Sequence, residues 1–367
     1  MIEAAGTVVV GYGSRRAYLM KALSASEAIW PALDRTYAYL FRPFQWETFL
    51  KLAAVATLSE GFLVSFRFAV PGAFPFEVNT AALRAFLLAP KFLPFTVLAA
   101  MAIFLTGVYC VSLVIRLRFA FVHSLIHQTR AIRPAAKLYS DEAERFFSAS
   151  MLVWLSFLVA VSLSIVLIAG VAYAVDGTLI PEGKLAPGSF LLLFLPSIGI
   201  VFVLLLAASA AQVVLNDFIL PHMAIEGAAF SKAWADVRVR IAANREAFLS
   251  FFLLRLGLPL VAGLVLGAVA WVVERAVFGV LGISAAGFSE MLDGAPGWRT
   301  YLLTATQTVF ALLGLGAGAV IAISFAGPIG VFMRSYALFF YGGHYQALGN
   351  LLDPAAGSAA TVETEDR

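Results

Sequence analysis

The stretch ASMLVWLSFLVAVSLSIVLIAGVAYAV, residues 149–175, contains no charged side chain. A helix of about 20 apolar residues is long enough to cross the hydrocarbon core of a bilayer. The whole 367-residue chain has a similar character, because 61% of its residues are hydrophobic and only 13% are charged. Soluble domains carry about 25% charged residues. The sequence therefore predicts an all-α integral membrane protein.

Six apolar runs predict six transmembrane helices. Their expected bounds are Trp46–Val70, Phe95–Ile115, Ala149–Val175, Phe190–Leu215, Ala247–Val273 and Tyr301–Phe325. A further apolar stretch, Ile329–Tyr341, follows Pro328 and contains Arg334, so we expect it to lie at the membrane interface without crossing the bilayer. The sequence leaves open whether the apolar segment Val277–Gly287 enters the outer leaflet.

The positions of Lys and Arg predict the orientation of these spans, because cytoplasmic loops are enriched in both residues. Most of them precede the first span or lie in the second and fourth connecting segments, which favours a multi-pass protein of the cell membrane with both termini cytoplasmic. The N-terminal residues do not match a cleavable signal peptide. The net charge of +3 is too small to indicate a nucleic-acid partner, and the single Cys110 argues against a disulfide framework.

A short motif returns along the chain and predicts an internal repeat. AIWPAL at residues 28–33 and AIRPAA at 131–136 are 103 residues apart, and AFSKAW at 229–234 is a weaker third copy. We expect three hairpin units, each with an interfacial amphipathic helix followed by two spans. The expected divisions are an N-terminal segment 1–23, a membrane domain 24–352 with units 24–117, 118–216 and 217–345, and a disordered tail 353–367.

An Arg and a Phe come directly before the first span of each copy, where they predict a corner in the chain. The pairs are Arg42 with Phe44, Arg145 with Phe147, and Arg245 with Phe248. Such an Arg can reach lipid phosphates while the Phe anchors the start of the span. The candidate lipid-headgroup contacts are therefore Arg42, Arg145, Arg245, Arg238 and Arg240.

The helix expected before the first corner is amphipathic. Its apolar face is formed by Ile29, Leu33, Tyr37 and Leu40, and Arg35 lies on the opposite, polar face. A helix of this kind lies in the plane of the interface with its apolar side toward lipid or the helix bundle.

Several stretches resemble a family of uncharacterised bacterial and archaeal polytopic membrane proteins. They are FRPFQWETFLKLAAVATL (41–58), DFILPHMAIEGAAFSKAWADV (217–237), NREAFLSFFLLRL (244–256) and GPIGVFMRSYALFFYGG (327–343). This family is similar to the membrane domain fused to some glycerophosphodiester phosphodiesterases. The resemblance covers most of residues 25–350 and implies a six-span membrane domain, but not phosphodiesterase activity, because the soluble catalytic barrel has no counterpart in the sequence.

Glu60 is the most unusual residue, because it falls within the first expected span. A carboxylate at that depth costs about 2.5–3.5 kcal/mol of insertion free energy, and such residues are candidates for function. One interpretation is a proton or cation relay together with Arg67. The others are a structural partner for Arg255, or a helix break that places Glu60 near an aqueous pocket.

Arg255 lies near the cytoplasmic end of the fifth expected span. This position favours a side chain that extends to the interface, and the alternative is contact with an anion or a lipid headgroup between helices. His123 and His127 are four residues apart and could share a metal ion, but no third ligand is evident, which favours interfacial hydrogen bonding and no metal.

Gly314 and Gly318 form a GxxxG pair in the sixth expected span. The pair predicts close helix packing, with a flexible gate as the alternative. The sequence contains no evident catalytic triad and no phosphate-binding loop, so we expect neither an enzyme nor a cofactor.

The sequence favours a non-enzymatic membrane protein that interacts with membrane lipids or forms the membrane subunit of a larger assembly with a protein partner. The alternative is a transporter or permease whose path is lined by Glu60, Arg67 and Arg255.

Overall fold

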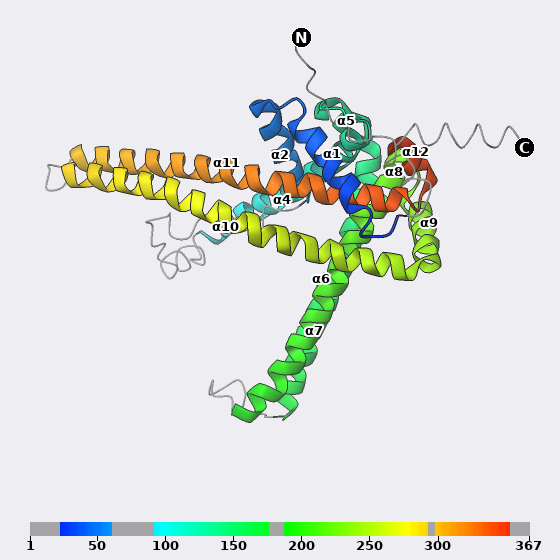
Figure 1. The fold of residues 1–367 in the computed structure, drawn as a ribbon. Helices are drawn as coiled ribbons and strands as arrows, with labels where there is room; N and C mark the ends of the chain where they lie inside the picture. Colours follow the sequence, from blue (N-terminus) through cyan, green and yellow to red (C-terminus); the bar gives the residue numbers. More distant parts are fainter. Residues whose placement is uncertain (1–22, 61–91, 176–186, 293–297, 353–367) are drawn as a thin grey trace, which may run out of the picture. The chain divides into compact units, whose positions relative to one another are not determined.

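The computed structural model describes residues 23–60, 92–175, 187–292 and 298–352, and every regular element within them is a helix (Figure 1). Two compact units are present, and each is described by itself: residues 1–139 with 246–367, and residues 140–245. The all-α prediction is confirmed for these ranges. The expected segment 1–23 and tail 353–367 lie almost entirely outside the described residues.

The described part of the first unit contains four short helices and three long ones. Its helices are α1 (Ile29–Phe41), α2 (Trp46–Glu60), α4 (Leu93–Ile126), α5 (Ile132–Leu138), α10 (Arg245–Leu292), α11 (Trp298–Gly342) and α12 (Gln346–Leu352). The second unit contains α6 (Ser140–Val175), α7 (Pro187–Val213), the π-helix η3 (Val214–Ile219), α8 (Leu220–Glu226) and α9 (Phe230–Ala243). In each unit two long helices lie side by side: α10 with α11, and α6 with α7 (Figure 1).

Five helical segments are long and apolar enough to cross a membrane: Pro94–Ile126, Ser140–Val171, Leu195–Glu226, Arg245–Ser284 and Thr308–Gly342. They coincide with the second to sixth spans expected from the sequence. The first expected span begins with α2 at Trp46, and its part after Glu60 lies outside the described residues. A multi-pass membrane protein is therefore supported, with five spans identified by length and composition.

These helices are longer than a bilayer requires. The 33 residues of Pro94–Ile126 extend about 50 Å, against a hydrocarbon thickness of about 30 Å. Exposed large apolar side chains on α4 run from Phe95 to Leu113, a length of about 27 Å. From Ile115 onward most of the large apolar side chains of α4 are buried, and Leu117 is half-buried. One part of α4 thus has the surface of a lipid-facing span, and the other packs inside the protein.

The segment Ile329–Tyr341 is not a separate element, because it continues α11; its expected position at the membrane interface stays a prediction. The helix α11 continues through Pro328 to Gly342, and most of the segment is buried, including Tyr336 and Tyr341. A proline removes one backbone donor from a helix, and neighbouring helices can compensate for such an interruption within a membrane protein.

Small residues permit α2 to approach α11 closely just at this proline. A Cβ atom added at Gly327 would overlap Ala53, and one added at Gly330 would lie 3.1 Å from the carbonyl oxygen of Ala56. The contact between these two helices is among the most extensive in the structure. Glycine is therefore required sterically on α11 where it passes Ala53 and Ala56.

Aromatic side chains from α10 and α11 form the core of the first unit. The Phe251 ring stacks on Tyr336 and Phe340, with ring centroids 5.1 Å and 4.3 Å away. Phe248 packs edge-on against Phe340 at 5.3 Å. These contacts explain why Ile329–Tyr341 is so apolar although it is too short to cross a bilayer.

The orientation of α1 differs from the prediction, because Arg35 is buried. Its Nη2 donates a hydrogen bond to the carbonyl oxygen of Leu352, 3.3 Å away, and its guanidinium lies 5.7 Å from the Phe339 ring centroid. Leu33 and Tyr37, expected on the apolar face, are 46% and 52% exposed. The partners of Arg35 follow it by about 300 residues, so helical periodicity alone could not reveal its burial.

Two of the three Arg-Phe corners lie at helix boundaries. Arg42 ends α1 and Arg245 begins α10, whereas Arg145 and Phe147 lie inside α6. The corner predicted at Arg145 is therefore wrong. The first turn of α6 contains Asp141 and Glu142, which favour a helix N-terminus through the helix dipole, so the chain is already helical at Arg145.

Candidate intramembrane charge cluster

Four helices of the first unit bring charged side chains together at the end of α2. The Glu60 carboxylate receives Arg334 from α11, with Nε 2.6 Å and Nη2 2.5 Å from Oε1. Arg255 from α10 donates through Nη2 to the other oxygen, Oε2, at 3.0 Å. Both carboxylate oxygens are therefore engaged, each by a different helix.

The same end of α2 is bound by a third guanidinium group. Arg118 of α4 donates from Nε to the carbonyl oxygen of Ser59, 2.5 Å away. Arg118 therefore binds the backbone of α2 beside Glu60, and α2 is held there by α4, α10 and α11. We refer to Glu60, Arg118, Arg255 and Arg334 as the Glu60 cluster.

Burial makes the Glu60 cluster costly to disrupt. The side chains of Glu60, Arg255 and Arg334 are 4%, 12% and 1% exposed. Transfer of ions from water into such an environment costs several kcal/mol per ion, and the mutual attraction has to offset this cost. Removal of one partner leaves the others buried with an uncompensated charge, which is the most destabilising change at such a site.

A second set of polar contacts holds α1 against the C-terminal end of α4. The Tyr39 hydroxyl lies 2.8 Å from the Ser124 hydroxyl. Arg130 donates to the carbonyl oxygens of Tyr39, Arg42 and Pro43 at 3.2 Å, 2.6 Å and 3.2 Å. Burial raises the pKa of Tyr39 to about 12, although the hydrogen bond with Ser124 and the charge of Arg130 both lower it.

The pairing of Glu60 with Arg255, one of the three interpretations of Glu60, is confirmed by the 3.0 Å contact. Arg67, the other residue proposed for a relay, lies outside the described residues. Sequence reasoning missed Arg334 and Arg118. The signal available for Arg334 was a lone cation within the apolar run VFMRSYALFF, the same kind of signal that singled out Glu60 and Arg255.

The paired histidines on α4 lie in a hydrogen-bonded aromatic environment. Nδ1 of His123 is 3.0 Å from the Tyr139 hydroxyl, and the His123 and His127 ring centroids are 4.4 Å apart. The predicted hydrogen bonding of His123 is confirmed.

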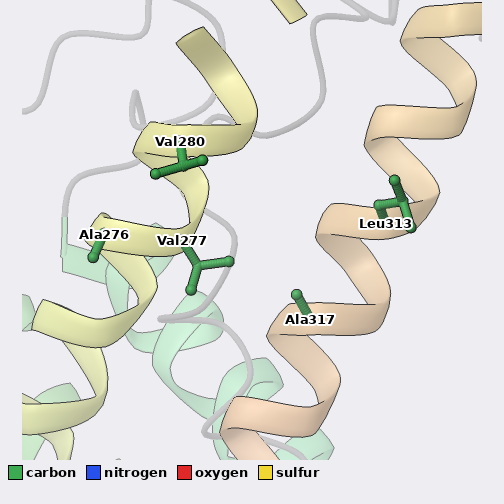
Figure 2. A pocket seen from close by; sticks show the side chains of 5 residues that line it. All are labelled: Ala276, Val277, Val280, Leu313 and Ala317. Atoms are coloured by element: carbon green, nitrogen blue, oxygen red, sulfur yellow. The ribbon is translucent and has the colours of Figure 1, made fainter. Parts of the chain in front are cut away.

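Gly314 and Gly318 lie where α10 packs on α11. A Cβ atom added at Gly314 or Gly318 would lie 3.1 Å or 3.3 Å from the Phe278 ring, so both glycines face this side chain of α10. Close packing of the two helix backbones stays a prediction. Next to this contact an open apolar cavity of about 510 Å³ is lined by Ala276, Val277, Val280, Leu313 and Ala317 (Figure 2). None of the five side chains offers a polar or ionisable atom, so this cavity fits an apolar group such as a lipid chain better than an ion.

The arginines predicted to contact headgroups are spread over four helices. Arg42, Arg145, Arg238 and Arg245 are exposed and Arg240 is half-buried. Arg42 lies in an aromatic surface at the junction of α1 and α2, with its Cζ 5.0 Å from the Tyr37 ring centroid. The Phe41 ring stacks on Tyr37 and Phe44 at 5.7 Å and 6.2 Å, and Trp46 lies 6.2 Å from Phe44. We call Tyr37, Phe41, Arg42, Phe44 and Trp46 the junction patch.

The model of a family of unknown function, DUF7544, matches residues 23–351. The chain belongs to DUF7544. The match includes the Glu60 cluster, the junction patch and all five candidate spans, so these features lie within the DUF7544 region. No curated protein and no solved structure matches the chain. Membership in a family of unknown function, together with the apolar helices of the structure, agrees with the resemblance to uncharacterised membrane proteins, while the similarity to phosphodiesterase-fused domains stays a prediction.

Proposed function

We propose that this protein is a non-enzymatic component of the cell membrane that binds anionic phospholipids at its cytoplasmic interface through the junction patch. The observation that carries the proposal is the composition of this patch. Tyr37, Phe44 and Trp46 are each more than half exposed, and the Arg42 guanidinium lies over the Tyr37 ring. Aromatic rings concentrate at the level of the headgroups in membrane proteins, and an arginine there can bind phosphate.

The position of the junction patch supports this proposal. Arg130 holds the chain at Arg42 and Pro43 through their carbonyl oxygens, which leaves the Arg42 side chain directed to the surface. In the predicted topology both termini are cytoplasmic, so α1 lies on the side where anionic lipids attract basic residues by about 1 kcal/mol each. Exposed Arg238 and Arg245 would add to the same attraction. Service as a membrane subunit for a protein partner is compatible with such binding.

The transporter alternative requires Glu60 to exchange a proton or a cation. Both of its oxygens are occupied by guanidinium groups, and its side chain is 4% exposed. Intramembrane carboxylates that relay protons face a water-filled path. This geometry favours a structural role for Glu60, and so it favours lipid binding over transport as the function.

The proposal is tested by native mass spectrometry of the full-length protein in neutral detergent, titrated with phosphatidylglycerol or phosphatidylcholine. We expect preferential retention of phosphatidylglycerol, and Arg42→Gln is expected to weaken that retention about fivefold, from the loss of about 1 kcal/mol. Arg275→Gln is the matched control, because Arg275 is also exposed and lies 5.4 Å from a single aromatic ring, that of Trp271.

Equal losses in the two variants would show unspecific attraction of anionic lipid to surface charge, and would reject the junction patch as a binding site. Equal retention of the two lipids by the unmodified protein would reject anionic selectivity. A proton or ion flux in proteoliposomes that disappears in Glu60→Gln, while the purified variant keeps its thermal stability, would favour the transporter instead.

A further inference from the structure

Three potential metal ligands converge in the second unit, apart from the Glu60 cluster and the junction patch. His222 and Glu226 are four residues apart on α8, and Asp236 lies on α9. The His222 Nε2 atom is 3.3 Å from the Asp236 carboxylate and 3.5 Å from the Glu226 carboxylate. The three ligand atoms all lie within 4.8 Å of one another.

The local sequence explains this convergence. Residues four apart on a helix project from the same side, which places His222 beside Glu226. Gly227 then ends α8 with a left-handed backbone, φ +61°, and its N–H donates to the Met223 carbonyl oxygen at 2.9 Å. Glycine adopts this conformation without steric cost. The chain reverses over Gly227–Ala229, and α9 returns along α8 so that Asp236 reaches His222.

We propose that His222, Glu226 and Asp236 form a site for a divalent metal ion, with zinc as the best fit. Zinc binds His nitrogen at about 2.0–2.1 Å and carboxylate oxygen at about 2.0–2.2 Å in tetrahedral geometry. Two ligands at such distances from a tetrahedral ion are separated by about 3.3–3.5 Å. Both measured separations from His222 Nε2, 3.3 Å and 3.5 Å, equal this tetrahedral edge.

Charge and burial are also compatible with a divalent ion. The His222 side chain is 1% exposed, while Glu226 and Asp236 are 32% and 42% exposed, so the site has a buried nitrogen ligand and an open side through which an ion can enter. Two carboxylates balance the charge of a divalent cation. Three protein ligands leave a fourth position for water or another group.

Two cations near the site oppose metal binding. Nζ of Lys232 lies 3.5 Å from the Glu226 carboxylate, with a side chain that is 65% exposed, so this pair is weak and can be displaced. Arg240 lies one turn after Asp236 on α9 and repels a positive charge at His222. A metal-free network of His222 with these four charged residues is the rival explanation for the cluster.

The π-helix η3 directly precedes α8 and ends at Ile219. π-helical segments are rare and often occur at functional sites, since they displace the following residues relative to an α-helix. Here the displaced segment is the one that carries His222. This feature is independent of the ligand distances, and it agrees with a site on α8.

The test measures zinc in the full-length protein in detergent, stripped with a chelator and then reloaded with Zn²⁺ alone. We expect one zinc per chain by elemental analysis after buffer exchange, and an increase in melting temperature on addition of zinc. Asp236→Asn is expected to weaken zinc binding at least about tenfold, because it removes one ligand. Lys232→Met is expected to strengthen binding by up to about fivefold, because it removes a competing cation.

His123→Gln is the matched control, since it alters a histidine that also has a potential ligand four residues away, His127, without touching the proposed ligands. Asp236→Asn keeps the size of the side chain at a surface position, so it avoids the risk that a substitution of buried His222 unfolds the unit. The proposal is overturned if the unmodified protein retains no zinc, if Asp236→Asn binds zinc as well as the unmodified protein, or if His123→Gln loses it. Weaker zinc binding in Lys232→Met would also overturn the proposal. In a metal-free network Lys232 stabilises the cluster, so its loss would only destabilise this part of the protein.

Discussion

Substitution of Glu60 by glutamine is the most direct perturbation of the fold. The change keeps the size of the side chain but removes the charge that faces Arg334 at 2.6 Å and Arg255 at 3.0 Å. Both guanidinium groups stay buried, at 1% and 12% exposure. Loss of one member of a buried ion pair costs about 3–5 kcal/mol, mostly from the charge left behind. With two arginines left, we expect Glu60→Gln to reach the upper part of this range.

The assay is thermal unfolding in detergent, followed by the fluorescence of the six tryptophans of the chain. A destabilisation of 1 kcal/mol lowers the melting temperature by about 2–4 °C in proteins of 150–250 residues. The expected decrease for Glu60→Gln is therefore at least about 6 °C. Glu47→Gln on the same helix is the control. Its carboxylate pairs with Lys51 at 2.6 Å, but the two side chains are 82% and 71% exposed, so its melting temperature should not change measurably.

The reasoning is refuted if Glu60→Gln melts within 1–2 °C of the Glu47→Gln control, about the shift expected from an exposed pair. A double-mutant cycle with Arg255→Gln provides a second check. If Glu60 and Arg255 interact as the structure shows, the double variant should be less destabilised than the sum of the single variants. An additive result would mean that the two residues do not stabilise each other.

Two further substitutions examine other contacts of the first unit. Gly330→Val should destabilise the protein by about 1–3 kcal/mol through overpacking, because its Cβ would lie 3.1 Å from the Ala56 carbonyl oxygen. Gly316→Ala is the control, because an added Cβ there has no neighbouring atom within 4 Å. Thermal unfolding should show a lower melting temperature for Gly330→Val alone. The pKa of Tyr39 is about 12 in the folded protein, against about 10 for an ordinary tyrosine, so only the unfolded chain loses this proton between the two values. The contribution of Tyr39 is thus fully present below pH 10 and falls by about 2 kcal/mol as the pH rises to 12. Tyr39→Phe should be less stable than the unmodified protein at pH 9, and this difference in unfolding free energy should be smaller at pH 11. A difference that is the same at both pH values would contradict the assigned pKa.

The spans and the Glu60–Arg255 pair could be predicted because each depends on local information. Uncharged runs of sufficient length can be read directly from the sequence, and a carboxylate or guanidinium within such a run requires a partner. Arg334 lies in a segment that is too short to span a bilayer, so the sequence does not indicate it as a partner within the membrane. It is nevertheless the closest partner of Glu60, at a separation of 274 residues.

The orientation of α1 and the second Arg-Phe corner could not be predicted for a related reason. Helical periodicity identifies which residues share a face, but not which face is covered. Arg35 was expected on the polar face of α1, opposite the face turned to lipid or the helix bundle, yet the carbonyl of Leu352 and the Phe339 ring cover it. Likewise, the repeat offset places Arg145 opposite Arg42, but the acidic first turn of α6 determines where that helix begins. Contacts with distant residues thus determine which face of α1 is buried, and the acidic residues of its first turn determine where α6 begins.

The length of α4 explains how several guanidinium groups are tolerated in apolar helices, and it yields a last prediction. Arg118 follows the exposed apolar side chains that end at Leu113 by five residues, or about 7.5 Å along the helix. That distance places Arg118 at the depth of the headgroups, where water and phosphate lower the cost of charge. Cys110 lies on the other side of this boundary and is exposed, so its thiol should face hydrocarbon.

In membranes, Cys110 should therefore resist a charged, membrane-impermeant maleimide and react fully after unfolding in dodecyl sulfate. A cysteine introduced at Leu138, which is 65% exposed on α5, should react in intact membranes from the cytoplasmic side when Cys110 is replaced by alanine. Cys110 and residue 138 both lie at the surface of the protein. A difference in their labelling would therefore come from the bilayer. Rapid labelling of Cys110 in intact membranes would show that the exposed band from Phe95 to Leu113 is not the lipid-facing part of α4.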